Sequence, residues 1–314
     1  MPWHWSLEEF AERRRRSLRV EHVSKTFPSG ICALDDVSLS FEGGLCALLG
    51  ADGSGKSTLL NIIAGVQPPD QGRVHFRNVD VVASPHRLRR VIGCVTGDPR
   101  LAPVVPVRVA LEHFARRYLG DGYGTGVPAP GPAFLQELLD RVGLAACHAQ
   151  HVGELSSGMM RRLGIAIALI KRPVLLLLDD PLIGLAPAER TELRALLSAV
   201  ARDMLVLFTT SEPDDLNLQC AEAAVLHQGR VLFVGATDRV LDDLRGRVWR
   251  GTVPRGEFQR MRARHVITDT LAAGDQVTVR VVSDQPPGSR FTMAEPRLAD
   301  AYLHLIDSEC TPDR

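Results

Sequence analysis

Apolar and polar positions along the chain follow two patterns, which predict strands of two kinds. Residues 18–23 and 33–41 alternate between apolar and polar side chains, which is typical of strands with one exposed face. Residues 45–50, 174–180 and 205–211 instead begin as continuous apolar runs. Such runs are expected of parallel strands that are buried on both faces.

Segments with helical periodicity lie among these strands. Apolar residues recur at helical spacing in residues 56–64, 107–119, 133–143 and 187–203. The alternation of strand, helix and strand predicts an α/β fold built on a parallel sheet. The glycine- and proline-rich residues 120–132 can form neither a long helix nor a central strand, so we expect a surface loop or linker there.

The pattern changes after about residue 235, where we expect a second, smaller domain to begin. Residues 275–284 alternate like a strand, and residues 296–307 have the pattern of a short amphipathic helix. We therefore divide the chain into a polar N-terminal leader (1–17), a main domain (18–235) and a small α+β accessory domain (236–314). A length of 314 residues agrees with this division.

Composition and charge narrow the class of protein. The 37 lysines and arginines balance 37 aspartates and glutamates, which argues against nucleic acid as a partner, since nucleic-acid-binding proteins usually carry a basic excess. The most apolar stretch, residues 163–178, is interrupted at 171–173, whereas a membrane-spanning helix needs about 20 apolar residues. The first residues lack the apolar segment of a secretory signal, and the six cysteines form no CxxC pair. We expect a cytoplasmic protein.

Residues 50–58 carry the clearest chemistry of the chain. They read GADGSGKST and fit the pattern G-x-x-x-x-G-K-[ST], between a buried strand and a helix. Glycines permit a tight turn that directs backbone N–H groups toward phosphate oxygens, and the helix N-terminus adds positive potential. The lysine supplies a point charge to the phosphates, and the serine hydroxyl a ligand to Mg²⁺. The predicted nucleotide-binding residues are Gly50, Asp52, Gly53, Ser54, Gly55, Lys56, Ser57 and Thr58.

The second half of a nucleotide site is expected at the end of the apolar run 174–178. Asp179 follows this run directly, and a carboxylate at the end of a neighbouring strand can hold Mg²⁺ beside the phosphates. The predicted metal ligands are therefore Ser57 and Asp179, with Mg²⁺ bound through the nucleotide. These residues predict nucleotide binding and leave open what the nucleotide is used for.

Four further motifs, in a fixed order after the phosphate loop, resemble those of the ATP-binding subunits of ABC transporters. LSSGM at 155–159 resembles the family signature LSGGQ, and DDP at 179–181 resembles the acidic strand end. LIGLAP at 182–187 resembles the D-loop, and TTS at 209–211 falls where the family has its switch histidine. The extension MRRLGIAIALI and the C-terminal EPRLADAYLHLI are similar to the ABC-2-type exporter subgroup.

The resemblance covers residues 18–235 and implies a specific fold. That fold is a P-loop (RecA-like) parallel sheet core with an antiparallel β subdomain and a helical insertion at about 97–170. Two such domains dimerise head to tail, so that Ser156, Ser157 and Gly158 would act in trans on ATP bound to the partner. Phe27, 29 residues before Lys56, falls where the family stacks an aromatic ring on adenine; it can also be an ordinary core residue.

The resemblance also implies partners and a location. The cofactors would be ATP and Mg²⁺, and the partners would be a second ATP-binding subunit and a polytopic membrane permease subunit. The chain would lie in the cytoplasm, peripheral on the inner face of the cell membrane through that permease. Segment 98–119 lies where the family contacts the permease.

The departures from the family pattern concern hydrolysis. The catalytic glutamate is replaced by Asp180, whose carboxylate lies about 1 Å further from an attacking water, and a misplacement of that size costs roughly 10²-fold in rate. Ser211 replaces the switch histidine and has no ring nitrogen. Gly97 stands at the Q-loop glutamine, Ala186 at the D-loop aspartate and Ser157 at the first signature glycine. We interpret these as degenerate catalytic motifs.

Three interpretations follow from these departures. In the first, which we favour, the chain is the degenerate half of a heterodimer and mostly holds ATP. In the second, it forms a homodimer that hydrolyses ATP slowly with Asp180 as a weakened base. In the third, it is a non-hydrolysing module that binds ATP to regulate an interaction.

Overall fold

The computed structural model describes residues 17–77, 79–119, 131–217 and 220–310. The predicted leader, except for its last residue, and most of the predicted linker at 120–132 therefore lie outside the described residues.

A central six-stranded sheet organises the main domain. Its spatial order is β10-β9-β3-β8-β7-β6, and all neighbouring strands are parallel except β10, which pairs antiparallel with β9. The carboxyl ends of β3, β7 and β8 therefore lie at one edge, where α/β sheets bind ligands. The strands are β3 (Leu45–Leu49), β6 (Ile92–Thr96), β7 (Leu175–Asp179), β8 (Leu205–Thr210), β9 (Glu222–His227) and β10 (Arg230–Gly235).

The continuous apolar runs reflect burial on both faces of this sheet. In β7, Leu175 and Leu177 pack in the core that contains α2 (Lys56–Ile63). Leu176 and Leu178 pack on the opposite face with the helices of the insertion. Successive side chains of a strand point to opposite faces, so only an uninterrupted apolar sequence fills both layers.

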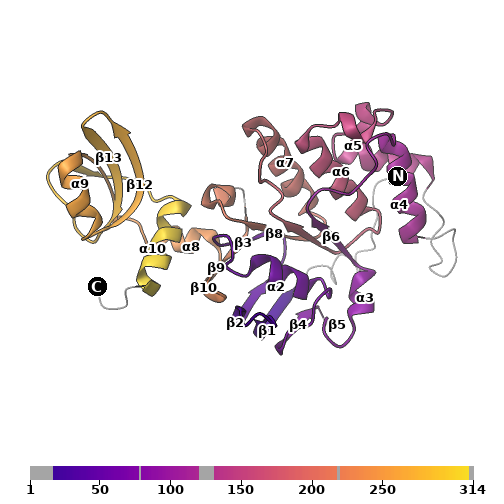
Figure 1. Ribbon diagram of the computed structural model, residues 1–314, viewed down its shortest axis with the longest axis horizontal. Helices are drawn as coiled ribbons and strands as arrows, with labels where there is room; N and C mark the ends of the chain where they lie inside the picture. Colours follow the sequence, from indigo (N-terminus) through magenta and orange to yellow (C-terminus); the bar gives the residue numbers. More distant parts are fainter. Residues whose placement is uncertain (1–16, 78, 120–130, 218–219, 311–314) are drawn as a thin grey trace.

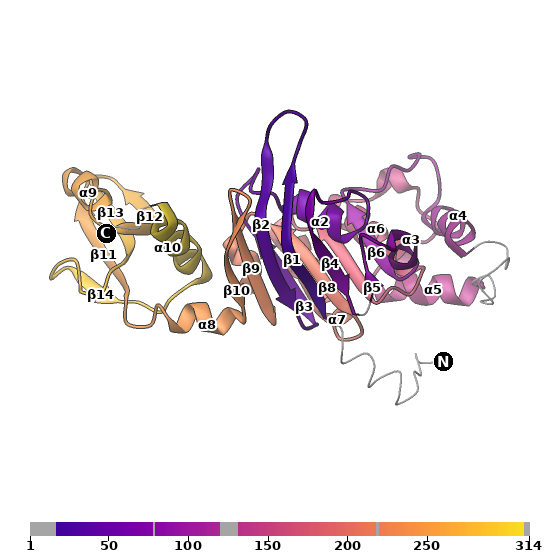
Figure 2. The ribbon, with the colours of Figure 1, turned by 90° about the horizontal axis from the view of Figure 1, so that it is seen from below.

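The antiparallel subdomain covers the α2 side of the central sheet. Its order is β2-β1-β4-β5, and the long pair formed by β1 and β2 projects beyond the rest of the domain (Figure 2). The alternating pattern at 18–23 and 33–41 arises because one face of this sheet packs on the core and the other is exposed. Its elements are β1 (Leu18–Thr26), β2 (Cys32–Phe41), β4 (Gln71–Phe76) and β5 (Val79–Asp80), followed by α3 (Pro85–Arg89).

Helices cover the other face of the central sheet, opposite α2 (Figure 1). They are α4 (Val107–Leu119), α5 (Pro132–Arg141), α6 (Ser157–Leu169) and α7 (Pro187–Val200), with the short 3-10 helices η1 (Ala145–Cys147) and η2 (Val152–Glu154). No helix among the described residues is long and apolar enough to cross a bilayer.

The C-terminal part forms a small α+β unit of its own. Four antiparallel strands in the order β12-β13-β11-β14 form its sheet. The helix α10 lies between this sheet and the β9–β10 edge of the central sheet (Figures 1 and 2). The elements are α8 (Thr237–Asp242), β11 (Val248–Pro254), α9 (Arg255–Arg262), β12 (Val266–Ala273), β13 (Gln276–Val282), β14 (Phe291–Met293) and α10 (Leu298–Cys310).

The structure confirms the predicted fold class and corrects several element boundaries. The helix predicted over 187–203 ends at Val200, after which the chain turns toward β8. The helix predicted over 296–307 begins at Leu298, two residues after Pro296. The strands β5 and β6 escaped prediction. β5 has only two residues, and in β6, which reads IGCVT, Gly93 and Thr96 leave no uninterrupted apolar run.

Candidate functional site

The loop between β3 and α2 needs glycine at defined positions. Gly53 and Gly55 have positive φ angles of 77° and 106°, where a side chain is strained. A Cβ at Gly55 would lie 2.4 Å from the Ala33 carbonyl oxygen, and one at Gly50 would lie 2.4 Å from the Leu226 carbonyl oxygen. The packing of the loop against neighbouring backbone therefore excludes larger residues at these sites.

Lys56 is folded back onto this loop. Its Nζ donates to the carbonyl oxygens of Gly50 (2.7 Å) and Ala51 (3.1 Å), and the residue is 5% exposed. The buried ammonium group donates to neutral carbonyl oxygens, which solvate it without offsetting its charge, and it interacts electrostatically with Asp180. It is therefore ready to exchange these acceptors for the oxygens of a bound anion.

An orphaned hydroxyl shows that the loop fits a phosphate. Ser54 is buried, and its Oγ has no hydrogen-bond partner among the described residues. Buried polar groups are almost always satisfied, so this atom indicates a missing acceptor. The N-terminus of α2 starts directly behind it at Lys56 and offers free backbone N–H groups. A polyphosphate would satisfy both.

Asp179 lies at the predicted place beside the loop. Its Oδ1 accepts hydrogen bonds from Ser57 Oγ (3.1 Å) and from Thr209 Oγ1 (2.7 Å). A hydroxyl and a carboxylate at this spacing are hard oxygen ligands of the type that Mg²⁺ takes, together with phosphate oxygens and water. Ser57 and Asp179 would therefore hold the metal, which neutralises phosphate charge when bound.

Asp180, directly after β7, has an unusual backbone conformation. Its φ angle is 44°, in the left-handed region that aspartate tolerates better than most residues. Its N–H donates to Thr209 Oγ1 (2.8 Å). Burial raises the pKa of its carboxyl, Lys56 opposes this, and the carboxylates of Asp179, Asp52 and Asp215 add to it. A raised pKa suits a group that accepts a proton.

The end of β8 is tied to the phosphate loop and to a buried carboxylate. The Thr210 carbonyl accepts the Gly50 N–H (3.1 Å), and Thr210 Oγ1 donates to Asp215 Oδ2 (2.7 Å). Ser211 follows directly and is half-buried. Its position is therefore fixed by Thr210, although its own side chain is short.

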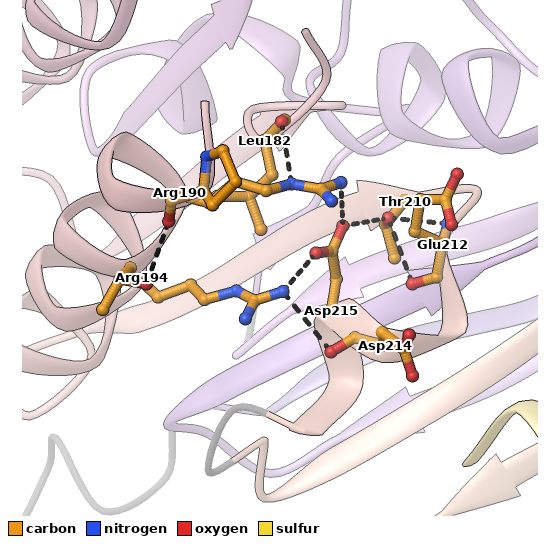
Figure 3. Close-up of polar contacts among 9 residues, drawn as sticks. Leu182, Arg190, Arg194, Thr210, Glu212, Asp214 and Asp215 are labelled. Atoms are coloured by element: carbon orange, nitrogen blue, oxygen red, sulfur yellow. Dashed lines mark hydrogen bonds and ion pairs between the residues drawn. The ribbon is translucent and has the colours of Figure 1, made fainter. Parts of the chain in front are cut away.

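Asp215, on η3 (Pro213–Asn217), is the centre of an ionic cluster (Figure 3). The residue is 1% exposed, and its carboxylate contacts Arg194 Nη2 (2.7 Å) and Arg190 Nη2 (3.5 Å). Arg190 also donates from Nε to the Leu182 carbonyl (3.3 Å). The cluster thus links the segment after β8 to the loop 180–186 and to α7.

Ser156 and Gly158 shape the N-terminus of α6. Ser156 is the N-cap, and its Oγ accepts the Met159 N–H (3.2 Å). Ser157 is the first residue of the helix and is exposed. A Cβ at Gly158 would lie 2.9 Å from the Glu189 carboxylate, so glycine is needed for the approach of this side chain.

A carboxylate from α7 already occupies these donors. Glu189 Oε1 accepts from Ser156 Oγ (2.6 Å) and from the Gly158 N–H (3.2 Å), and Oε2 accepts from the Ala186 N–H (3.3 Å). The hydrogen bonds from Ser156 and Gly158 hold the pKa of the Glu189 carboxyl below its ordinary value. The N-terminus of α6 therefore binds an anion within the same chain.

Comparisons with known proteins agree with this geometry. A family model described as "ABC transporter" matches residues 34–183. The Nod factor export ATP-binding protein I of Rhizobium etli is 31% identical over 274 residues, which are 83% of this chain and 84% of that protein. The chain belongs to the ABC transporter ATP-binding family. The probable multidrug ABC transporter ATP-binding protein YbhF of Escherichia coli is 27% identical over 283 residues. The chain spans about half of YbhF, namely 47% of its length.

Solved ABC cassettes share the fold. The structure of cbiO1 from Clostridium perfringens, part of the ABC transporter complex cbiONQ, matches with a TM-score of 0.63 at 25% identity, over 79% of this chain and 94% of that one. The dimeric structure of the bacterial ABC transporter cassette MJ0796 matches with a TM-score of 0.60 at 24% identity, over 70% of this chain and 98% of that one. Another MJ0796 dimer is bound to ADP and Pi. ATP and Mg²⁺ are the cofactors of this ABC cassette.

The structure brings most of the predicted ATP-binding residues of the cassette together. Gly50, Gly53–Ser57 and Asp179 converge at the carboxyl ends of β3 and β7, with Asp180 beside them. Asp52 is exposed on the loop, and Thr58 lies in the first turn of α2. Phe27 lies half-buried in the turn after β1, outside the core clusters of the described residues.

The signature residues of the cassette lie apart from its own phosphate loop. No hydrogen bond among the described residues joins 156–158 to 50–58; the signature donors bond to Glu189 instead. This separation agrees with the prediction that the signature acts in trans, which remains a prediction.

Sequence reasoning missed three residues that organise the site. Thr209 bonds to Asp179 and Asp180 together, Asp215 holds the cluster behind the D-loop, and Glu189 covers the signature. Thr209 could have been found as a hydroxyl at the buried end of a strand parallel to β7. Asp215 and Glu189 carry no comparable local signal.

Proposed function

We propose that the chain is the ATP-binding subunit of an ABC-2-type exporter and drives export by a separate polytopic permease. The intact phosphate loop with its orphaned Ser54 hydroxyl is the observation that carries this proposal. The relatives named for Nod factor export and multidrug transport support the export direction. The chain would lie in the cytoplasm, on the inner face of the membrane through the permease.

The proposed dimer places ATP between two subunits. Lys56, Ser54 and the N–H groups of one phosphate loop would bind the phosphates, while Ser156 and Gly158 N–H of the partner would bind the γ-phosphate. Ile183, in the D-loop beside Asp180, is 54% exposed, and the partner subunit of such a dimer would cover it. Binding energy from ATP would favour the closed dimer.

We propose that hydrolysis in the chain's own site is weakened. Asp180 is the candidate general base, and Ser211 lies where the family's switch histidine would contact the γ-phosphate. A heterodimer with a second ATP-binding subunit whose catalytic residues are intact is the arrangement we favour, with a slow homodimer as the alternative. In the heterodimer this chain contributes its signature to the partner's site.

The permease would dock on segment 98–119 and the groove beside it. Val104 and Val109 in this segment are exposed, and Asp98 forms an ion pair with Arg161 of α6 (3.2 Å). A neighbouring groove contains Val66 and Tyr118. Movement of the permease would therefore reach α6, which carries the signature.

We further propose that 18–235 is the ATP-binding domain, with the helical insertion at about 97–170, and that 236–314 is the accessory domain.

Steady-state turnover and binding of Mg-ATP by the full chain test these proposals. We expect the wild type to bind Mg-ATP. Lys56→Ala should abolish this binding, because the ammonium group is the main charge offered to the phosphates. Lys25→Ala is the control and should leave the binding unchanged. We expect Asp180→Glu to raise turnover by up to about 10²-fold, because it brings the carboxylate about 1 Å closer to water.

The outcomes separate the alternatives. Slow turnover that depends on Lys56 would show a working ATPase and remove the need for a catalytic partner. ATP bound without turnover, with Asp180→Glu restoring it, would support the degenerate half of a heterodimer. ATP bound without turnover in both forms would favour a regulatory module, and absence of ATP binding would overturn the proposed function.

A further inference from the structure

The D-loop, residues 182–187, has no side chain that can form a hydrogen bond. It reads LIGLAP, so its conformation depends on its backbone groups. Two of these groups are held from the start of α7. The Leu182 carbonyl accepts from Arg190 Nε (3.3 Å), and the Ala186 N–H donates to Glu189 Oε2 (3.3 Å).

The tip of the D-loop lies between these two held positions. Leu182 is buried in the core beneath α7, whereas Ile183 is 54% exposed. Gly184 follows with a φ angle of 72°, which turns the chain back toward the helix. The direction of this exposed tip therefore depends on the contacts at Leu182 and Ala186.

Arg190 joins the D-loop to a buried carboxylate through the two arms of its guanidinium group (Figure 3). Its Nε donates to the Leu182 carbonyl, while its Nη2 contacts Asp215 Oδ2 (3.5 Å). A guanidinium group presents its donors in a fixed planar arrangement. One side chain thus holds two acceptors from different segments in a set geometry.

Asp215 is held from other directions as well, which makes it a firm anchor. The residue is 1% exposed, and its carboxylate accepts from Thr210 Oγ1 (2.7 Å) and from Arg194 Nη2 (2.7 Å). The Thr210 carbonyl in turn accepts the Gly50 N–H (3.1 Å). A continuous chain of polar contacts therefore runs from the phosphate loop, through Thr210 and Asp215, to the guanidinium group that holds the D-loop.

We propose that Arg190 is the positioning residue of the D-loop, and that through it the phosphate loop sets the geometry in which Ile183 meets a partner subunit. The inference rests on the proposed function for its consequence, a response to ATP, but not for its structural part. Lys56 donates to the Gly50 carbonyl (2.7 Å), and a bound triphosphate would draw its ammonium group away. The change would thus begin at Gly50, the first member of the chain of contacts.

Arg190→Met and Arg194→Met are a matched pair of variants. Both arginines lie on α7, contact the Asp215 carboxylate and have side chains that are 30% and 26% exposed. Each variant leaves Asp215 with one arginine and with Thr210. Arg194 makes the shorter contact, so Arg194→Met should lower the thermal unfolding midpoint at least as much as Arg190→Met. Only Arg190→Met releases the Leu182 carbonyl.

Amide hydrogen exchange of the nucleotide-free full chain tests the structural part. Peptides that cover 182–186 should exchange about three- to tenfold faster in Arg190→Met than in the wild type, which is the range for loss of one hydrogen bond. Arg194→Met should keep the wild-type rate in these peptides. Unchanged exchange in Arg190→Met would overturn the proposal. Equal acceleration in both variants would also overturn it, because it would show a general loosening of α7.

Exchange in saturating Mg-ATP tests the consequence, at a protein concentration where sedimentation velocity shows a monomer. Mg-ATP should slow exchange in 182–186 in the wild type and in Arg194→Met, and should have no such effect in Arg190→Met. The affinity of Arg190→Met for Mg-ATP should stay within about twofold of the wild-type value, since Arg190 lies outside the predicted ATP-binding residues.

The outcomes in Mg-ATP separate the inference from the proposed function. A wild-type response in Arg190→Met would overturn the proposal, as would a wild type that binds Mg-ATP without any response in 182–186. Absence of ATP binding by the wild type would count against the proposed function, while the result on the nucleotide-free chain would still decide the role of Arg190.

Discussion

At the scale of single residues, Thr209 has the broadest influence on the acidic strand end. It is fully buried, and its hydroxyl donates to the Asp179 carboxylate while accepting the Asp180 N–H. One side chain thus orients the proposed metal ligand and the proposed base. Hydrogen bonds to a carboxylate are stronger than those between neutral groups. Loss of this hydroxyl would leave the Asp179 carboxylate with the longer hydrogen bond from Ser57 (3.1 Å) and would take away the acceptor of the Asp180 N–H.

Thr209→Val is expected to weaken Mg²⁺-dependent ATP binding by about one order of magnitude, because a hydrogen bond to a charged group contributes about 1.5–3 kcal/mol. Titration of the chain with ATP at a series of Mg²⁺ concentrations measures this effect. Thr209→Ser keeps the hydroxyl and should behave like the wild type. If Thr209→Val showed the same Mg²⁺ dependence of ATP binding as the wild type, the hydrogen bond from Thr209 on β8 would not be needed to orient Asp179.

At the scale of elements, the start of α7 covers the start of α6. Glu189 places its carboxylate on Ser156 and Gly158, the same donors that we assign to the partner's γ-phosphate. These donors lower the Glu189 pKa from 4.5, so the contact stabilises the fold above the pKa of the unfolded chain and fades as the pH falls through the lower folded value. At neutral pH the carboxylate is charged, and closure of the proposed dimer would displace it.

Glu189→Gln is expected to strengthen ATP-dependent association of the cassette with a second copy or with its partner subunit by about three- to tenfold. A neutral amide binds the two donors more weakly than a carboxylate and does not repel the triphosphate. Sedimentation velocity with and without Mg-ATP measures the association. Glu192→Gln is the matched control, because Glu192 lies on the same helix and pairs with Arg162 instead. Weaker association of Glu189→Gln would indicate that the carboxylate supports the signature.

Prediction from sequence succeeded where the information is local. The phosphate loop is a run of nine residues, and β3, β7 and β8 are runs of apolar residues, so both are visible in short windows. Ser156 and Glu189 lie 33 residues apart and Thr209 and Asp179 lie 30 apart. Such pairs depend on how α6, α7 and β8 pack, which no single window contains.

At the scale of the whole molecule, the buried pair of Arg280 and Asp300 fixes α10 to the C-terminal sheet. The Asp300 carboxylate accepts hydrogen bonds from Arg280 Nη2 (2.6 Å), from Thr268 Oγ1 and from the Arg297 N–H (2.8 Å). Both members of the pair have hydrogen-bond partners. Replacing one member alone should therefore destabilise the protein much more than replacing both members by apolar residues. The exposed pair of Arg247 and Asp284 in the same C-terminal unit offers a direct contrast, since Asp284 is largely in solvent.

Asp300→Leu is expected to destabilise the chain by about 3–5 kcal/mol, because it leaves a buried arginine without a counter-charge. The double variant Arg280→Met/Asp300→Leu should recover most of this loss, and Asp284→Asn should change stability by less than about 1 kcal/mol. Urea unfolding followed by circular dichroism gives these values. Equal loss in the single and double variants would mean that the hydrogen bonds to Thr268 and Arg297, rather than the charge, hold the helix.

The packing of α10 on the apolar core of the main domain also bears on the order in which the protein folds during synthesis. The strands of the central sheet leave the ribosome before α10, which is the last helix along the chain among the described residues. Domains fold from the N-terminus as they emerge. A growing chain would therefore hold a folded central sheet whose apolar side chains Leu49, Leu216 and Phe233 stay uncovered until α10 has docked.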